Sequence, residues 1–127
     1  ARESVEFLTY VYWRGEIAQR FAHALAEKAR EGVAVRVLLD AFGAAPMARS
    51  LISTMEDGGV ILRWFRPLKR FRLWRDLRRT HRKVLVTDGE VGFTGGVGIA
   101  TEWCGDARDH TEWRDTHFRI VGPAVRG

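Results

Sequence analysis

The residues best suited to chemistry in this sequence lie between His81 and Gly96. His81 is followed two positions later by Lys83 and, after four more residues, by Asp88; six residues then precede the pair Gly95-Gly96. Side chains two apart in a strand point to the same face, so His81 and Lys83 should project together. An imidazole can act as a nucleophile or carry a proton, and an ammonium can neutralise an anionic oxygen. This spacing therefore predicts phosphate chemistry on one face of a strand.

The dipeptide Asp88-Gly89 predicts a two-residue hairpin loop between strands at residues 83–87 and 90–94. Asp88 lies seven residues along the chain from His81, which is roughly 23 Å in an extended strand at about 3.3 Å per residue. Its carboxylate therefore cannot reach His81, and we expect Asp88 to shape the turn.

A two-residue loop also predicts which residues face each other across the hairpin. Paired positions then sum to 177, which places Lys83 opposite Thr94 and His81 opposite Gly96. A glycine lets a ligand approach the backbone closely, so we expect Gly95 and Gly96 to give a phosphate room beside the imidazole.

Apolar segments that favour strands alternate along the chain with amphipathic segments that favour helices. We expect strands at residues 5–13, 33–40, 60–64 and 116–121, and helices between residues 15 and 32 and over 48–57. The first strand, helix and second strand form a βαβ unit, for which a parallel pair with a right-handed crossover is the default. The fold class is therefore α/β, with a mixed sheet flanked by helices.

Positive charge is concentrated in residues 63–83, which we call the basic stripe. It contains ten basic side chains and one acidic one, a net charge of +9; because the whole chain carries +5, the remaining residues sum to −4. Such a stripe predicts an anionic partner, which could be phosphate, lipid headgroups or nucleic acid. Within it, Phe71, Trp74 and Leu77 recur at helical spacing. This is typical either of an amphipathic helix at a membrane surface or of a basic connection whose aromatic side chains pack on the body.

The composition describes one globular domain of 127 residues, with 46% hydrophobic and 29% charged residues. Its 13 glycines and 3 prolines exclude collagen and indicate tight turns rather than disorder. Cys104 is the single cysteine, so no intrachain disulfide can form, which favours a reducing compartment or redox indifference. The sequence contains neither an apolar run of about 18 residues nor a signal-peptide profile. We therefore expect a cytoplasmic protein with peripheral membrane association, unless a longer parent chain carries an anchor.

The motif at His81 resembles the signature of the phospholipase D superfamily, His-x-Lys-x4-Asp-x6-Gly-Gly. Two further segments, residues 36–43 and 113–125, are similar to the cardiolipin synthase branch of that superfamily. The resemblance implies a mixed α/β sandwich in which residues 1–127 form one half-domain of a phospholipase D-like two-fold domain. It also implies a phosphodiester reaction that needs no metal and no cofactor. In that reaction one histidine attacks phosphorus to give a phosphohistidine, and a second protonates the leaving group.

The resemblance also implies roles for individual residues. His81 is one of the two catalytic histidines, and which of the two attacks is left open. Lys83 neutralises the non-bridging phosphate oxygens, and Gly95 and Gly96 also bind the phosphate. Gly98 stands where the family usually has asparagine. A hydrogen bond to phosphate is therefore lost there or is supplied by another residue.

A further acid should orient the imidazole, because Asp88, although part of the catalytic signature, is expected to lie too far away. Asp115, at the start of the last predicted strand, is the candidate because a family acid occurs at the matching place. Asp109 and Glu112, in the same loop, are rivals. The other histidines and Cys104 lack the spacing of metal ligands, so we expect no metal site.

The reaction of the superfamily needs two such motifs, and this sequence contains one. His23, His110 and His117 are followed two residues later by leucine, glutamate and arginine. The second motif is expected from the rest of a longer protein, with this chain as its N-terminal half. The alternative is a homodimer in which each copy supplies one His81, as in small nucleases of the superfamily.

Three functions are consistent with these features. The first is phosphatidyl transfer or hydrolysis on anionic phospholipids, with the basic stripe contacting the membrane. The second is cleavage of nucleic acid, since basic residues interleaved with aromatic ones could hold a phosphate backbone and stack bases. The third is a phosphate-binding half-domain without turnover.

Overall fold

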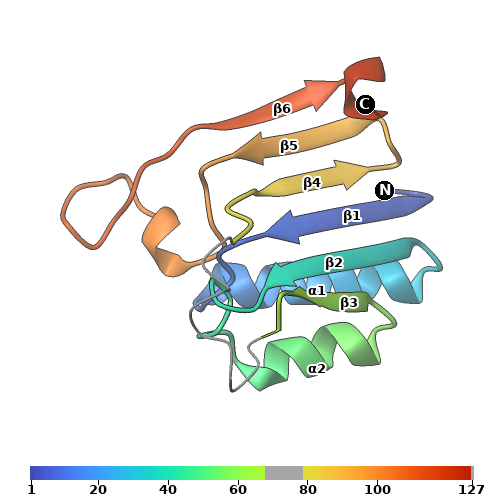
Figure 1. Ribbon diagram of the computed structural model, residues 1–127, viewed down its shortest axis with the longest axis horizontal. Coiled ribbons are helices and arrows are strands. Elements are labelled where there is room, and N and C mark those ends of the chain that lie inside the picture. The colour runs from blue at the N-terminus through green and yellow to red at the C-terminus, as the bar shows by residue number, and fades with distance from the viewer. Residues whose placement is uncertain (68–78, 127) are drawn as a thin grey trace.

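Six strands form one mixed sheet in the computed structural model, which describes residues 1–67 and 79–126 (Figure 1). The order of the strands across the sheet is β3-β2-β1-β4-β5-β6. The elements are β1 (Ser4–Thr9), α1 (Glu16–Arg30), β2 (Ala34–Asp40), α2 (Arg49–Asp57), β3 (Ile61–Phe65), β4 (Val84–Thr87), β5 (Val91–Gly95) and β6 (His117–Val121), with short 3₁₀ turns at Thr101–Trp103 and Pro123–Arg126. The predicted α/β class with a mixed sheet is confirmed.

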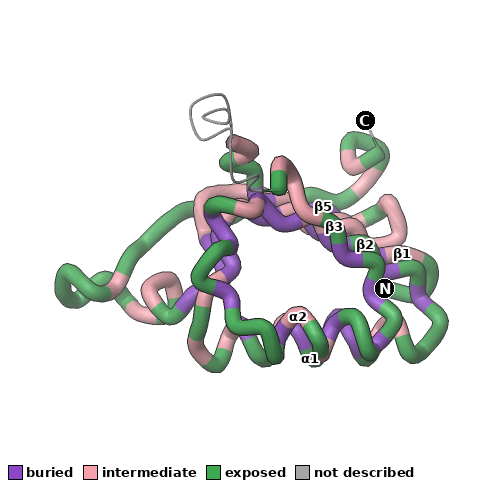
Figure 2. Tube along the Cα trace, turned by 60° about the horizontal axis from the view of Figure 1, so that its bottom comes forward, coloured by how far each residue is buried: buried purple, intermediate pink, exposed green. Residues whose placement is uncertain are grey.

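The parallel half of the sheet contains the core. β1 pairs in parallel with β2 and β2 with β3, and α1 and α2 connect them. Both helices lie on the same face of the sheet, and buried residues line the facing sides of the two layers (Figure 2). Val37 and Leu39 of β2, Ala22 of α1 and Met55 of α2 belong to one buried cluster. The alternation of buried residues along β2 is the cause, because it directs every second side chain towards the helices.

The other half of the sheet is antiparallel. β4 runs antiparallel to β1, and β5 and β6 continue in the same manner. Neither α1 nor α2 covers this half, as Figure 1 shows. β6 forms one edge of the described sheet, opposite β3, and all five residues of β6 are exposed.

The register of the β4–β5 hairpin differs by one residue from the predicted one. Asp88 and Gly89 form the expected turn, with φ of 55° and 63°, and the backbone N–H of Glu90 donates to the oxygen of Thr87 at 3.0 Å. Strand pairing resumes with Thr87 opposite Val91. Glu90 is therefore an extra residue on one side of the hairpin, which is the effect of a β-bulge.

This shift changes which residues face the motif. Thr94 pairs with the residue after Lys83, so the register, continued one position outward, brings Lys83 level with Gly95. The predicted pairs, Lys83 with Thr94 and His81 with Gly96, are wrong. The physical reason is that the turn dipeptide determines the loop but does not reveal an unpaired residue beside it.

The first strand is shorter than predicted. β1 ends at Thr9, after which Tyr12 enters the core and its hydroxyl donates to the backbone oxygen of Ala18 at 2.7 Å. Tyr12 also forms an isolated bridge with Ile99. The apolar run after Thr9 therefore reflects burial in the core, which a sequence pattern does not distinguish from a buried strand.

Two sequence predictions concern the membrane. The predicted amphipathic segment, with half of the basic side chains of the basic stripe, falls on residues 68–78 and lies outside the described residues. Of the two helices in the described ranges, neither has the length and hydropathy needed to cross a bilayer.

Candidate active site at the start of β4

The His81 motif lies at the edge of the sheet where the parallel strands end. β4 runs antiparallel to β1, so the residues just before Val84 lie beside the carboxyl ends of β1 and β2. Ligand sites of α/β folds form at this edge. The Nζ atom of Lys83 is 3.4 Å from Nδ1 of His81. His81 is exposed, whereas Lys83 is only 5% exposed, so an accessible imidazole is backed by a buried cation.

The ammonium of Lys83 is in an environment that favours an anionic ligand. Burial lowers the pKa of Lys83, and the negative charge of Asp115 partly opposes this effect. The hydroxyl of Thr94 donates to the backbone oxygen of Lys83 at 3.0 Å, which ties the start of β4 to β5. Because burial penalises the charged form, a phosphate oxygen beside Nζ would stabilise the ammonium that the protein compensates only in part.

The two glycines of the motif make room for the segment that carries Asp115. A Cβ atom on Gly96 would overlap the carboxylate of Asp115, and one on Gly95 would overlap the backbone oxygen of Thr116. The backbone N–H of Gly96 donates to the same Thr116 oxygen at 3.0 Å. Space that the sequence assigned to a phosphate is thus taken, at Gly96, by a carboxylate of the site itself. The phosphate-binding role of the glycines stays a prediction.

Asp115 acts on Lys83 through its charge and lies against Gly96. Its carboxylate accepts from the backbone N–H of Thr116 at 2.7 Å and acts electrostatically on Lys83. In the part of the chain that the structure describes, Asp115 and His81 form no hydrogen bond with each other. Its role as the group that orients the imidazole therefore stays a prediction.

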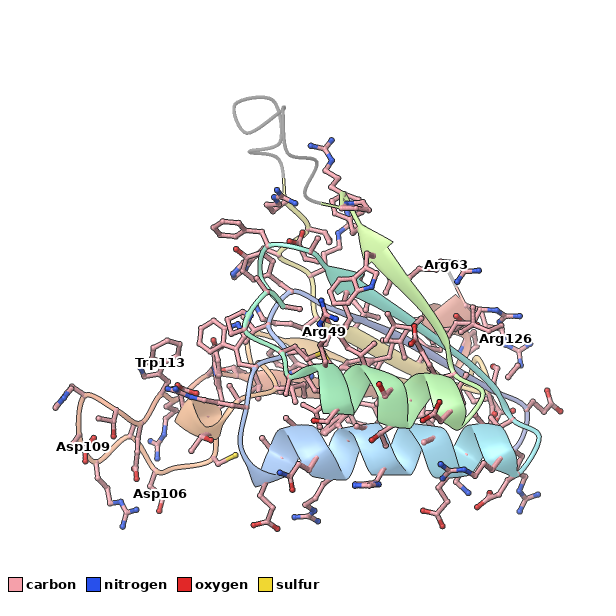
Figure 3. The ribbon with its side chains drawn as sticks, turned by 90° about the horizontal axis from the view of Figure 1, so that it is seen from below. Arg49, Arg63, Asp106, Asp109, Trp113 and Arg126 are labelled. Carbon is pink, nitrogen blue, oxygen red and sulfur yellow. The ribbon has the colours of Figure 1, made fainter. Side chains whose placement is uncertain are left out.

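The two rival acids, Asp109 and Glu112, make their contacts within their own loop. Asp109 accepts from the backbone N–H and the hydroxyl of Thr111 at 2.8 and 2.7 Å, and Glu112 pairs with Arg108 at 2.9 Å. Asp109 lies on a loop that projects away from the body of the molecule (Figure 3). Within residues 1–67 and 79–126, no group of three or more histidine, cysteine or acidic side chains is placed to hold a metal ion.

Asp88 lies at the opposite end of β4 from the motif histidine. Its carboxylate accepts backbone N–H bonds from Arg2, Glu3 and Ser4 at distances between 2.8 and 3.0 Å. The bond from Ser4, followed by those from Glu3 and Arg2, lowers the pKa of Asp88 to about 2. Asp88 therefore ties the hairpin turn to the start of β1, which is a structural role.

Two residues that the sequence analysis did not assign to the site also contact the motif. The ring of Tyr10 lies 4.6 Å from the ring of His81, measured between centroids. Asp40 is fully buried and accepts from the backbone N–H of Thr80, the residue before His81, at 3.2 Å. The sequence could have indicated Asp40 as a site residue, because it ends an apolar strand at the edge where α/β folds place their ligand sites.

An apolar cavity adjoins Lys83. It has a volume of about 450 Å³, lies between α1 and the first strands of the antiparallel half, and is lined by Lys83 and mostly apolar side chains, among them Phe7, Leu85 and Phe93. Its size is that of an ordinary ligand pocket. Lys83 thus belongs both to the polar site and to an apolar space beside it.

Residues 1–109 match the family model described as cardiolipin synthase, PLD-like domain. The chain belongs to this family. Among its relatives, cardiolipin synthase 1 of Bacillus cereus is 34% identical over 126 residues, covering 98% of this chain and 25% of the relative. Cardiolipin synthase of Geobacillus kaustophilus is 39% identical over 127 residues, covering 99% of this chain and 25% of the relative. The chain thus spans about a quarter of the length of the curated relatives it matches.

Solved structures show the same fold. The phospholipase D family member Nuc of Salmonella typhimurium matches with a TM-score of 0.61 and 18% identity, covering 95% of this chain and 67% of Nuc. NucT of Helicobacter pylori matches with a TM-score of 0.66 and 18% identity, covering 94% of this chain and 68% of NucT. The resemblance that the His81 motif indicated is confirmed at the level of family and fold.

Proposed function

We propose that this chain is a catalytic half-domain of a cardiolipin synthase-like enzyme that transfers or hydrolyses phosphodiester bonds of phospholipids. The observation that carries the proposal is the contact between an exposed imidazole and a buried ammonium, His81 Nδ1 and Lys83 Nζ at 3.4 Å. The motif stands at the ligand-binding edge of an α/β sheet, in a chain of the cardiolipin synthase family. The activity is proposed for the complete protein, of which this chain supplies one motif.

The proposed reaction proceeds in two steps. An imidazole nitrogen attacks phosphorus, a nitrogen–phosphorus bond forms, and the bond to the leaving alcohol breaks while a second histidine protonates that alcohol. An acceptor alcohol or water then attacks phosphorus, loses its proton to the second histidine, and the nitrogen–phosphorus bond breaks. Lys83 neutralises the non-bridging oxygens, whose charge grows in both transition states. Whether His81 attacks or protonates depends on the order in which the two motifs act.

Substrate binding changes the hydrogen bonding of His81 in this proposal. Nδ1 faces an ammonium, which only donates, so a neutral imidazole keeps its proton on Nε2. Attack through Nε2 needs the proton on Nδ1 instead. A bound phosphate would draw the Lys83 ammonium to its oxygens and free Nδ1, and Asp115 is the proposed acceptor for the Nδ1 proton.

The second motif is proposed to come from the rest of a longer protein. The chain matches only about a quarter of each curated relative, so the relatives have room for a second half-domain. The alternative, two copies that each supply His81, predicts a dimer, whereas a single chain has a mass of 14.5 kDa.

A phospholipid substrate is proposed because apolar and phosphate-binding features share one residue. Lys83 lines the cavity of about 450 Å³ with Phe7, Leu85 and Phe93, and hydrocarbon is the ligand chemistry that such a wall accepts. Contact with an anionic membrane through the basic stripe belongs to the same proposal. Anionic vesicles and oligonucleotides can each be tested as competitors of the phosphodiester reaction. Only the vesicles should inhibit it, which separates this proposal from the nuclease hypothesis.

Release of p-nitrophenol from bis(p-nitrophenyl) phosphate in excess EDTA tests the chemistry. Activity that depends on His81, is retained in His23→Ala, and rises per molecule with concentration would mean that two copies assemble a complete site. His23 is the matched control because it lies exposed on α1. Equal activity in wild type and His81→Ala would overturn the proposal. Inactivity of both, in this chain and in the full-length protein, would leave the non-catalytic hypothesis.

A further inference from the structure

We infer that Asp40 and Tyr10 are positioning residues that hold His81 in place from two sides, one through the backbone and the other through the ring. The inference rests on the proposed function, because it assigns these residues a task only if His81 acts on a phosphate. Neither residue belongs to the His81 motif. Both reach it from the ends of neighbouring strands, β2 for Asp40 and the segment after β1 for Tyr10.

Asp40 is a fully buried carboxylate whose oxygens divide their hydrogen bonds between two segments. Oδ1 accepts from the backbone N–H groups of Phe42 and Gly43 at 2.9 and 3.1 Å, while Oδ2 accepts from Thr80 at 3.2 Å. Arg79 lies 3.9 Å from Oδ1 and balances its charge. One side chain thus joins the loop after β2 to the backbone just before the motif histidine.

A buried charge is a costly way to join two loops. Desolvation of a carboxylate is unfavourable even when the ion is paired, and an apolar side chain of similar volume is often equally stable. What a carboxylate offers is direction, because each N–H must point at an oxygen. Asp40 therefore fixes where the backbone before His81 runs, from the buried carboxyl end of β2.

Tyr10 restrains the ring from the other side. Its centroid lies 4.6 Å from that of His81, within the range of aromatic contacts. Tyr10 itself is held by Gly43, because a Cβ atom there would overlap the backbone oxygen and ring of Tyr10. Gly43 also donates to Asp40, so one loop supports both restraints.

Two variants separate the restraints. In Asp40→Asn the side chain keeps its shape and one acceptor oxygen, but its NH₂ group cannot accept the bond from Thr80. In Tyr10→Leu the aromatic ring beside His81 is removed, while Asp40 and the backbone N–H groups that donate to it are left in place. Asp88→Asn is the matched control, because that carboxylate also accepts backbone N–H bonds but at the far end of β4.

NMR on the isotope-labelled chain is the direct measurement, with the ring signals of His81 assigned by their loss in His81→Gln. In Asp40→Asn we expect at least tenfold faster exchange of the Thr80 amide and a shift of the His81 ring signals. Tyr10→Leu should move the same ring signals towards the positions of an unstacked histidine, with Thr80 exchange unchanged. Asp88→Asn should leave both observables at their wild-type values.

Kinetics on the assembled enzyme complete the test. Displacement of a reacting group by about 1 Å can cost about 100-fold in rate, so kcat should fall roughly 10- to 100-fold in both variants with KM unchanged. Wild-type Thr80 exchange and His81 signals in Asp40→Asn would overturn the inference, as would equal changes in Asp88→Asn. A wild type without turnover would count against the proposed function alone, because the NMR comparison needs no activity.

Discussion

At the scale of single residues, the burial of Lys83 favours the proposed function and lowers the stability of the fold. Its side chain is buried between β4 and the apolar cavity, and burial lowers its pKa. The same burial makes its ammonium an effective partner for phosphate, because a charge acts more strongly where water is excluded. The residue best placed for the proposed chemistry therefore costs the folded state free energy.

Replacement of Lys83 by methionine tests this conflict. Turnover should fall about 100- to 1,000-fold, as when one electrostatic donor is removed from an active site. The unfolded chain binds more protons than the folded one between the lowered pKa of Lys83 and the ordinary value of 10.5. The contribution of Lys83 to stability therefore rises with pH across that window, and Lys83→Met should abolish this rise. Urea unfolding at several alkaline pH values measures it; Lys28→Met is the opposite case, because a hydrogen bond to Glu31 raises the pKa of Lys28, so that variant should not remove the rise.

At the scale of elements, the β4–β5 hairpin is held at both ends by carboxylates. Asp88 ties the turn to the first residues of β1, while Asp115 lies against Gly96 where β5 ends. One acid stabilises the sheet and the other belongs to the candidate site. Their tests should therefore give different outcomes.

Asp88→Asn should lower the melting temperature at neutral pH, because the amide is a weaker acceptor for the N–H groups of Glu3 and Ser4. The folded-state pKa of Asp88 is lowered from 3.8 to about 2, so its contribution is present above pH 3.8 and is lost as the pH falls through 2. The difference between variant and wild type should shrink over that interval in thermal melts. A difference that is constant with pH would contradict the role assigned to the carboxylate.

Gly96→Ala should impair the site more than the fold. The new methyl group would overlap the carboxylate of Asp115, so we expect at least a tenfold loss of turnover with little change in melting temperature. Gly32→Ala is the opposite case, since Gly32 has φ of +90° and nothing within 4 Å of an added Cβ. It should cost about 1–2 kcal/mol of stability through backbone strain and leave turnover intact.

At the scale of the whole molecule, the two halves of the sheet differ in how they are covered. Helices bury one face of β1–β3, whereas β6 is an edge strand with Phe118 59% and Val121 60% exposed. An exposed apolar edge strand is a site where another chain can pair or pack. The two helices thus cover one face of the parallel half and leave the antiparallel half uncovered.

We therefore expect the isolated chain to self-associate through β6. Light scattering or sedimentation should show a mass that rises with concentration above 14.5 kDa in the wild type. Ile120→Lys, which places a charge on the edge strand, should shift the chain towards monomer, while Ile61→Lys on β3 should not. Equal association in both variants would assign the contact to another surface.

Sequence alone was sufficient for most of what depends on local pattern, the end of the first strand excepted. The alternation of buried residues in β2, the four-residue spacing in α1 and the turn at Asp88-Gly89 each follow from short-range periodicity or backbone preference, and they gave the correct α/β class. The spacing of His81 and Lys83 likewise indicated the family, because two residues so close along the chain stay near each other even though both lie just before β4 rather than on it.

Tertiary structure alone decided what depends on the meeting of distant segments. The extra residue Glu90 shifted the hairpin register, the carboxylate of Asp115 took the space beside Gly96, and Asp40 and Tyr10 joined the motif from other strands. None of these follows from local pattern, because strand pairing and long-range packing set the positions. The sequence therefore determined which chemical groups this protein can use, and packing determined which of them lie within reach of His81.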